Sequence, residues 1–274
     1  MRKWFKRIAV ALAAMAALDV TAVYVLSEMR LARTYDTPVA TFDASAHAFS
    51  LQEAERRAKS LMCTSCHARG GGVIFEAKYV GRLVAPNLSV RAKDYSDGEL
   101  ERLVRHGVKR DSTGVIAMPA ATYAHLADED LAAIIRYLRS LKAEPDAAGT
   151  TEWGPLGRLA LALGKIPYEA DHLPAVSRSK TRPENLGAYL VGATCLHCHN
   201  IGRERDNGFG MKTPPLAMMA ASYGFDEFRE PMRTGIGKGD RDLGLMTEVA
   251  RQDFAHFTDA EMKAIHDYLV SKAE

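Results

Sequence analysis

The sequence has no large excess of charge of either sign. Its 36 Lys and Arg residues nearly balance 34 Asp and Glu residues, which gives a formal net charge of +2. A nucleic-acid-binding domain normally carries a strongly basic face or segment, so we expect no nucleic acid among the partners. Hydrophobic residues make up 47% of the chain and charged residues 26%, which excludes an intrinsically disordered protein.

Cysteine is scarce, and none is left over outside two short motifs. The four cysteines form two C-x-x-C pairs, Cys63 with Cys66 and Cys195 with Cys198. Two disulfides, or one zinc ion bound by both pairs, are the ordinary interpretations of such a pattern. Neither explains why a histidine follows each pair directly, His67 in the first and His199 in the second.

C-x-x-C-H is the attachment motif of c-type haem. The two sulfurs form thioethers with the vinyl groups of one porphyrin, and the histidine is then held below the iron as an axial ligand. We therefore predict two covalently bound haem c groups, with His67 and His199 as iron ligands. The carbonyls of Pro86 and Pro214 are candidates to orient these histidines. His197, inside the second motif, is expected to face solvent.

The sixth iron ligand decides between an electron carrier and an enzyme, because a methionine fills the site whereas an open iron binds small molecules. Met118 is the candidate in the first half, since Pro119 stiffens its loop. Met246 lies at the corresponding place in the second half. The rival residues are the remaining methionines of the second half and three histidines: Met211, Met218, Met219, Met232, Met262, His106, His125 and His256.

A long apolar run lies near the N-terminus. Four basic residues precede the 19 residues Ile8–Leu26, which as a helix would measure about 28 Å and just cross a bilayer. A basic flank stays in the cytoplasm, so the rest of the chain would lie outside. The favoured interpretation is a retained anchor. The alternative is a cleaved signal peptide whose hydrophobic region is Ile8–Leu18 and whose cleavage site is Ala14-Met15-Ala16.

The remainder of the chain repeats one plan. Each half has a helix leading into C-x-x-C-H, a middle helix, a methionine loop and a last helix. The separations are similar, 51 residues from His67 to Met118 and 47 from His199 to Met246. We predict an all-α protein divided into an anchor or signal segment, a first domain, a linker and a second domain, with the bounds 1–30, 45–142, 143–182 and 183–274.

The predicted linker is rich in Pro and Gly and contains a short apolar stripe, Leu156, Leu159 and Leu163. We expect this stripe to pack against a domain surface. Contact with the membrane is the alternative.

These motifs resemble those of the membrane-anchored diheme cytochromes c of bacteria and the cytochrome c subunits of membrane-bound alcohol and gluconate dehydrogenases. Besides the two haem motifs, the resemblance rests on Ala85-Pro86-Asn87-Leu88, Arg105-His106-Gly107-Val108, Ala117-Met118-Pro119, Arg233-Thr234-Gly235 and residues 257–269. It implies two tandem class I cytochrome c domains after a transmembrane helix, with Met118 and Met246 as axial ligands. Those dehydrogenase subunits typically carry three haem motifs, whereas this chain has two.

The expected function is electron transfer in the periplasm between an oxidoreductase and a downstream acceptor. Expected partners are a dehydrogenase, another cytochrome or an oxidase, together with the inner membrane, which the chain would cross once. No catalytic residue is predicted. The alternative is a diheme peroxidase in which one iron has an open site.

Overall fold

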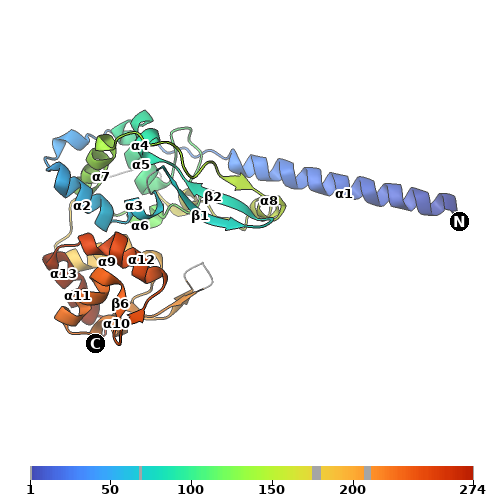
Figure 1. Ribbon diagram of the computed structural model, residues 1–274. Helices are drawn as coiled ribbons and strands as arrows, with labels where there is room; N and C mark the ends of the chain where they lie inside the picture. The colour runs from blue at the N-terminus through green and yellow to red at the C-terminus, as the bar shows by residue number, and fades with distance from the viewer. Residues whose placement is uncertain (1, 68–69, 175–179, 207–210, 274) are drawn as a thin grey trace.

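The computed structural model describes residues 2–67, 70–174, 180–206 and 211–273. A long N-terminal helix, α1 (Arg2–Leu31), extends away from two lobes, as Figure 1 shows. Among the described residues, α1 is the one helix that is long and apolar enough to cross a membrane. Because side chains along most of its length are exposed, α1 lacks the protein packing that normally covers such an apolar surface.

The first lobe is built from helices and one hairpin. Its elements are η1 (Ala44–Ala46), α2 (Leu51–Ser60), α3 (Cys63–Cys66), β1 (Gly72–Ala77), β2 (Gly81–Ala85), α4 (Leu88–Arg91), η2 (Ala92–Asp94), α5 (Asp97–His106), α6 (Ala120–Tyr123) and α7 (Asp128–Ser140). A capping box of Ser96 and Glu99, a pattern visible in the sequence, begins α5, and Gly107 ends this helix with a φ of 66°. Helices α2 and α7 pack together through their apolar faces.

Residues 143–182, predicted as a linker, contain β3 (Glu152–Trp153), α8 (Pro155–Ala162) and η3 (Glu169–His172). Strand β3 pairs antiparallel with β2, which itself pairs with β1. No strand was expected from the sequence, so the all-α expectation is incomplete for the described residues. They include this three-stranded sheet and two small hairpins in the second lobe.

The second lobe repeats the helical plan of the first. Its elements are α9 (Leu186–Thr194), η4 (Cys195–His197), β4 (Arg205–Asp206), β5 (Lys212–Thr213), α10 (Leu216–Ala221), α11 (Phe225–Thr234), β6 (Ile236–Gly237), β7 (Arg241–Asp242), α12 (Leu245–Gln252), η5 (Phe254–His256) and α13 (Asp259–Val270). A second capping box, formed by Thr258 and Glu261, begins α13. Met262, one of the rival ligands, lies on the buried face of α13.

One hydrophobic cluster continues from the first lobe into the second, and includes Leu61, Leu126 and Ile134 together with Leu190 and Phe254. Polar bonds cross the same boundary. The Tyr189 hydroxyl donates to Asp130 Oδ2 at 2.6 Å and accepts from the Ala127 amide at 3.0 Å. The two lobes therefore share a core, and the two haem motifs are held in a fixed relation to each other.

Candidate functional site

The first C-x-x-C-H motif forms a single helical turn. Met62, with a φ of 65°, reverses the chain between α2 and α3, and His67 follows α3 directly. His67 Nδ1 lies 2.8 Å from the Pro86 carbonyl oxygen, which can only accept a hydrogen bond. The proton is therefore on Nδ1, and Nε2 keeps a free lone pair. Burial lowers the pKa of His67, which favours this neutral ring.

A cavity of about 870 Å³ opens beside this motif. Its wall includes Cys63, Cys66, His67 and Met118. Most of the remaining lining is apolar, from the sheet, α5 and α7: Ile74, Leu83, Val84, Leu100, Leu103, Val104, Ile134 and Leu138. Two thiols, an unprotonated imidazole nitrogen and an apolar slot of this size fit a covalently attached porphyrin.

Met118 reaches the cavity from a tight loop between α5 and α6. Ala117 has a φ of 65°, and the Met118 carbonyl accepts a hydrogen bond from the Ala120 amide at 2.8 Å. Pro119 caps α6. The loop therefore presents a thioether to the cavity from a backbone that is fixed on both sides.

The second motif has a similar local geometry. Helix α9 continues into η4, and His199 Nδ1 lies 3.1 Å from the Pro214 carbonyl oxygen. The predicted orienting role of the two proline carbonyls is thus matched by a contact in each lobe. The Arg205 guanidinium donates to the carbonyl of Leu196 at 2.7 Å, which fixes the turn of the motif.

Met246 occupies the first turn of α12, half-buried against the core. It follows Gly235 by 11 positions, as Met118 follows Gly107 by 11. Both glycines have positive φ and end the middle helix of their lobe. A Cβ on Gly235 would lie 2.3 Å from Thr247 Cα, so this glycine lets the helix end and the segment carrying Met246 approach closely.

Several rival ligands are engaged elsewhere. Met262 and Met232 lie in the core, whereas Met218 and Met211 are exposed. Met219 is partly buried against the core. His106 Nδ1 bonds the Pro174 carbonyl, and His125 is exposed.

The prediction that His197 faces solvent is wrong. It is half-buried and lines the first-lobe cavity together with Ala193 and Thr194 of α9. The sequence could not indicate this, because the contact depends on how the two lobes pack. The turn that carries the second motif therefore forms part of the wall of the cavity beside the first motif.

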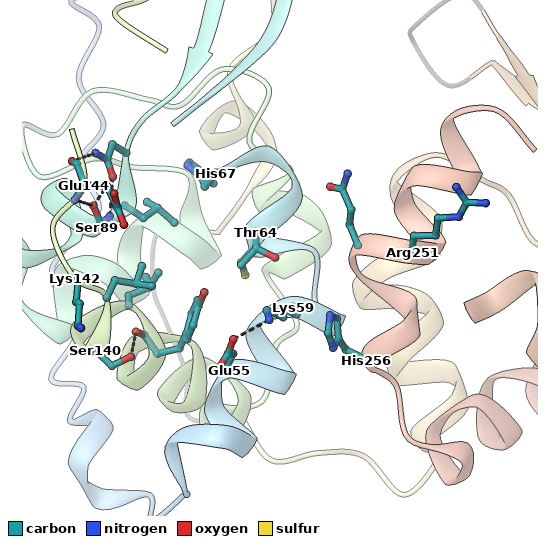
Figure 2. Close-up of a pocket in the computed structure, with 17 residues that line it drawn as sticks. Glu55, Lys59, Thr64, His67, Ser89, Ser140, Lys142, Glu144, Arg251 and His256 are labelled. Atoms are coloured by element: carbon teal, nitrogen blue, oxygen red, sulfur yellow. Dashed lines mark hydrogen bonds and ion pairs between the residues drawn. The ribbon is translucent and has the colours of Figure 1, made fainter. Parts of the chain in front are cut away.

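A second cavity, of about 630 Å³, also touches the first motif. Figure 2 shows Arg251 and His256 of the second lobe on the side opposite Lys59 and Thr64 of the first. His256, considered as a distal ligand, thus lies on the wall of this cavity.

Asp253 also lies at the boundary between the two lobes, and the sequence did not predict its burial. Its side chain is fully buried near Cys63 and Cys66, and neither carboxylate oxygen has a hydrogen bond to a described residue. The neighbouring Ser65 hydroxyl donates to the Met62 carbonyl at 3.0 Å. Burial raises the pKa of Asp253 to about 7.

Comparisons with known proteins agree with this geometry. Residues 50–138 match the family model described as cytochrome c oxidase, cbb3-type, subunit III, and residues 185–273 match that of cytochrome c. The chain is 25% identical to the gluconate 2-dehydrogenase cytochrome c subunit of Pantoea cypripedii, over 84% of this chain and 61% of that protein.

It is 26% identical to the fructose dehydrogenase cytochrome subunit of Gluconobacter japonicus, over 85% of this chain and 55% of that protein. It is 24% identical to the alcohol dehydrogenase (quinone) cytochrome c subunit of Gluconobacter oxydans (strain 621H), over 83% of this chain and 56% of that protein. The chain thus spans less than two thirds of the length of these relatives. Residues 50–138 and 185–273 are cytochrome c domains, and together they bind two covalently attached haem c groups.

Proposed function

We propose that this chain is an electron-transfer subunit, which passes electrons from an oxidoreductase to a downstream acceptor such as an oxidase or another cytochrome. The haem iron supplies one-electron exchange between its ferrous and ferric states. The cytochrome c subunits named above belong to gluconate, fructose and alcohol dehydrogenases, which supports a dehydrogenase as the electron donor.

In this proposal the chain's own residues hold and shield the haems. Cys63 and Cys66 form the thioethers of the first haem, and Cys195 and Cys198 those of the second. His67 and Met118 are the axial ligands of the first iron. His199 and Met246 are those of the second. Support comes from the two histidine–proline contacts, from Met118 in the cavity wall, and from the equal glycine-to-methionine spacing.

The domain plan is part of the same proposal. Two class I cytochrome c domains, residues 45–142 and 183–274, are joined by residues 143–182. Helix α1, which covers residues 2–30 of the predicted segment 1–30 and ends at Leu31, is a retained single-pass anchor in a bacterial inner membrane, with both domains in the periplasm. The length and apolarity of α1 support this, as does its basic start.

Electrons are proposed to pass directly between the two lobes. Residues Ala193, Thr194 and His197, next to or within the second motif, line the cavity of the first. This shared cavity wall is the observation that carries the proposal, because it brings the two redox sites together in one continuous hydrophobic core. The peroxidase alternative finds no support in the comparisons, whose relatives are cytochrome subunits of dehydrogenases.

The test separates a carrier from an enzyme. Dithionite-reduced protein should pass both electrons to a small dye or a partner cytochrome. It should bind carbon monoxide slowly, since the gas must displace a tethered methionine. Rapid stoichiometric binding of carbon monoxide at one haem, with peroxide turnover above that of a free haem peptide, would contradict the proposal.

A further inference from the structure

Helix α8 exposes apolar side chains, whereas a helix on the surface of a soluble protein normally exposes polar ones. Leu156, Leu159 and Leu163, one helical face, are 53%, 40% and 62% exposed. The opposite face, with Gly157 and Leu161, is buried. The stripe predicted to pack against a domain is therefore uncovered, and the side of α8 turned away from the protein is apolar as well as the buried side.

The position of α8 is fixed by the carboxyl end of α1. Arg158 Nη1 donates to Ser27 Oγ at 3.0 Å and to Glu28 Oε1 at 2.6 Å. Its guanidinium also lies 4.7 Å from the ring centroid of Tyr24. Just beyond α8, the Tyr168 hydroxyl donates to the Arg30 carbonyl at 2.9 Å. Helix α8 is thus held beside residues 24–30, where the apolar run of α1 ends at Leu26.

The turn between β1 and β2 extends the same surface. The Leu156 amide donates to the Tyr79 carbonyl at 2.9 Å, so Tyr79 adjoins the start of α8. Tyr79 is 59% exposed, and Lys78 and Lys165 are exposed nearby in sequence. Figure 1 shows α8 and this hairpin on the side of the first lobe from which α1 leaves.

We propose that Tyr79, Leu156, Leu159 and Leu163, here called the α8 face, rest in the interfacial layer of the bilayer that α1 spans. This inference depends on the proposed anchor. An apolar helix face with an aromatic side chain and flanking lysines is typical of a segment lying in the membrane surface. Such a contact, together with the bonds that join α8 to α1, would fix the orientation of both haem domains above the membrane.

The bilayer is a better occupant than a partner protein because of where the α8 face lies. Once α1 crosses the membrane, the clamp of Arg158 to Ser27 and Glu28 holds α8 at the level where the apolar run of α1 ends. The hydrocarbon boundary lies at that level. No further partner is then needed to cover the three leucines.

The test compares two introduced cysteines in the full-length holoprotein, reconstituted at less than one copy per vesicle of phosphatidylethanolamine and phosphatidylglycerol. The native cysteines are consumed by haem attachment, so Leu163→Cys or Met218→Cys carries the reactive thiol. Met218 is the matched control, 69% exposed on α10 of the second lobe. Met218→Cys also corrects for molecules oriented inward, which an impermeant maleimide does not reach.

Leu163→Cys should react with the maleimide at least about tenfold more slowly than Met218→Cys, because a polar reagent does not enter the apolar layer. Equal rates in vesicles that float with the protein would overturn the α8 proposal and leave the anchor intact. Protection that disappears on further dilution would also overturn it, since a second copy would then be the cover. Protein that does not float would instead contradict the anchor.

Discussion

Asp253 is the residue whose environment is least suited to its charge. Its buried carboxylate has no hydrogen bond to a described residue, and its pKa is raised to about 7 from an ordinary 3.8. Below pH 3.8 the group is protonated in both states. As the pH rises towards 7, the unfolded chain loses this proton while the folded protein keeps it. The contribution of Asp253 to stability therefore falls over this interval and stays low above it.

We predict that Asp253→Asn removes this fall. The variant should gain stability relative to the original protein between about pH 4 and 7, reaching on the order of 2–4 kcal/mol at higher pH. Unfolding in guanidinium at several pH values measures this difference in the free energy of unfolding. Asp267→Asn is the control, and it should lower stability at neutral pH rather than raise it. The hydrogen bond from Lys263 lowers the pKa of that exposed carboxyl, so its charge favours the folded state. A difference that does not change with pH would contradict the prediction.

Single substitutions test the two proposed methionine ligands separately. Met118→Ala and Met246→Ala should each abolish the far-red thioether-to-iron absorption band of one haem. Each should also lower the midpoint potential of that haem alone, because losing the thioether favours ferric iron. Met218→Ala, an exposed methionine, should change neither quantity. If Met246→Ala leaves both haems unchanged, the second ligand lies elsewhere, and Met232 or His256 becomes the next candidate.

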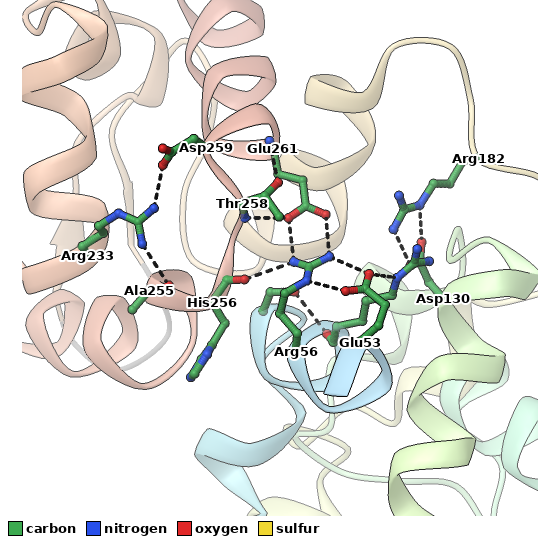
Figure 3. A network of polar contacts seen from close by, with 12 residues as sticks. Glu53, Arg56, Asp130, Arg182, Arg233, Ala255, His256, Thr258, Asp259 and Glu261 are labelled. Atoms are coloured by element: carbon green, nitrogen blue, oxygen red, sulfur yellow. Dashed lines mark hydrogen bonds and ion pairs between the residues drawn. The ribbon is translucent and has the colours of Figure 1, made fainter. Parts of the chain in front are cut away.

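At the scale of elements, α2 is joined to the second lobe by Arg56. Its guanidinium lies 2.8 Å from Glu53 within α2 and 2.7 Å from Glu261 at the start of α13. It also donates to the His256 carbonyl at 3.0 Å. Figure 3 shows Arg56 between the two carboxylates, so its loss leaves two negative charges close together at a partly buried boundary.

Arg56→Met should therefore destabilise the protein by about 1–3 kcal/mol. The matched control is Lys263→Met, which removes an exposed ion pair with Asp267 on the same helix α13 and should cost no more than about 0.5 kcal/mol. Denaturant unfolding followed by circular dichroism compares the two variants. Similar small losses in both would mean that the Arg56 network does not join the lobes.

Local signals predicted the helices well but missed the sheet. The boxes at Ser96 and Thr258 act within four residues, so the sequence located α5 and α13. Strand β1 begins at Gly72, directly after Gly70 and Gly71, and three consecutive glycines are typical of a turn rather than of a strand. Its third strand, β3, lies about 70 residues further along the chain, and a pairing of that range leaves no local pattern.

At the scale of the whole molecule, both haem motifs and their histidine–proline contacts follow from sequence spacing. The packing of one lobe on the other does not. His197 was expected to face solvent because nothing near it in the sequence indicates a partner, yet it lines the cavity of the other lobe. Asp253 is similar, since it is buried where α12 meets α3 and η5 meets α2, two contacts between the lobes.

This packing predicts an effect that crosses between the domains. His197 belongs to the second motif, but its ring forms part of the wall of the first cavity, and burial lowers its pKa so that the ring is neutral. Replacing it with alanine opens that wall to water, which stabilises the ferric charge. His197→Ala should therefore lower the potential of the first haem, by on the order of tens of millivolts.

The measurement needs the two haems to be resolved. In a Met246→Ala background, the remaining far-red band belongs to the first haem, so its redox titration follows that haem alone. Adding His197→Ala should shift this titration to lower potential, whereas His172→Ala, an exposed histidine of η3, should not. If only the second haem responds to His197→Ala, the lobes do not share the cavity wall in solution. The proposed direct passage of electrons between them would then need a different route.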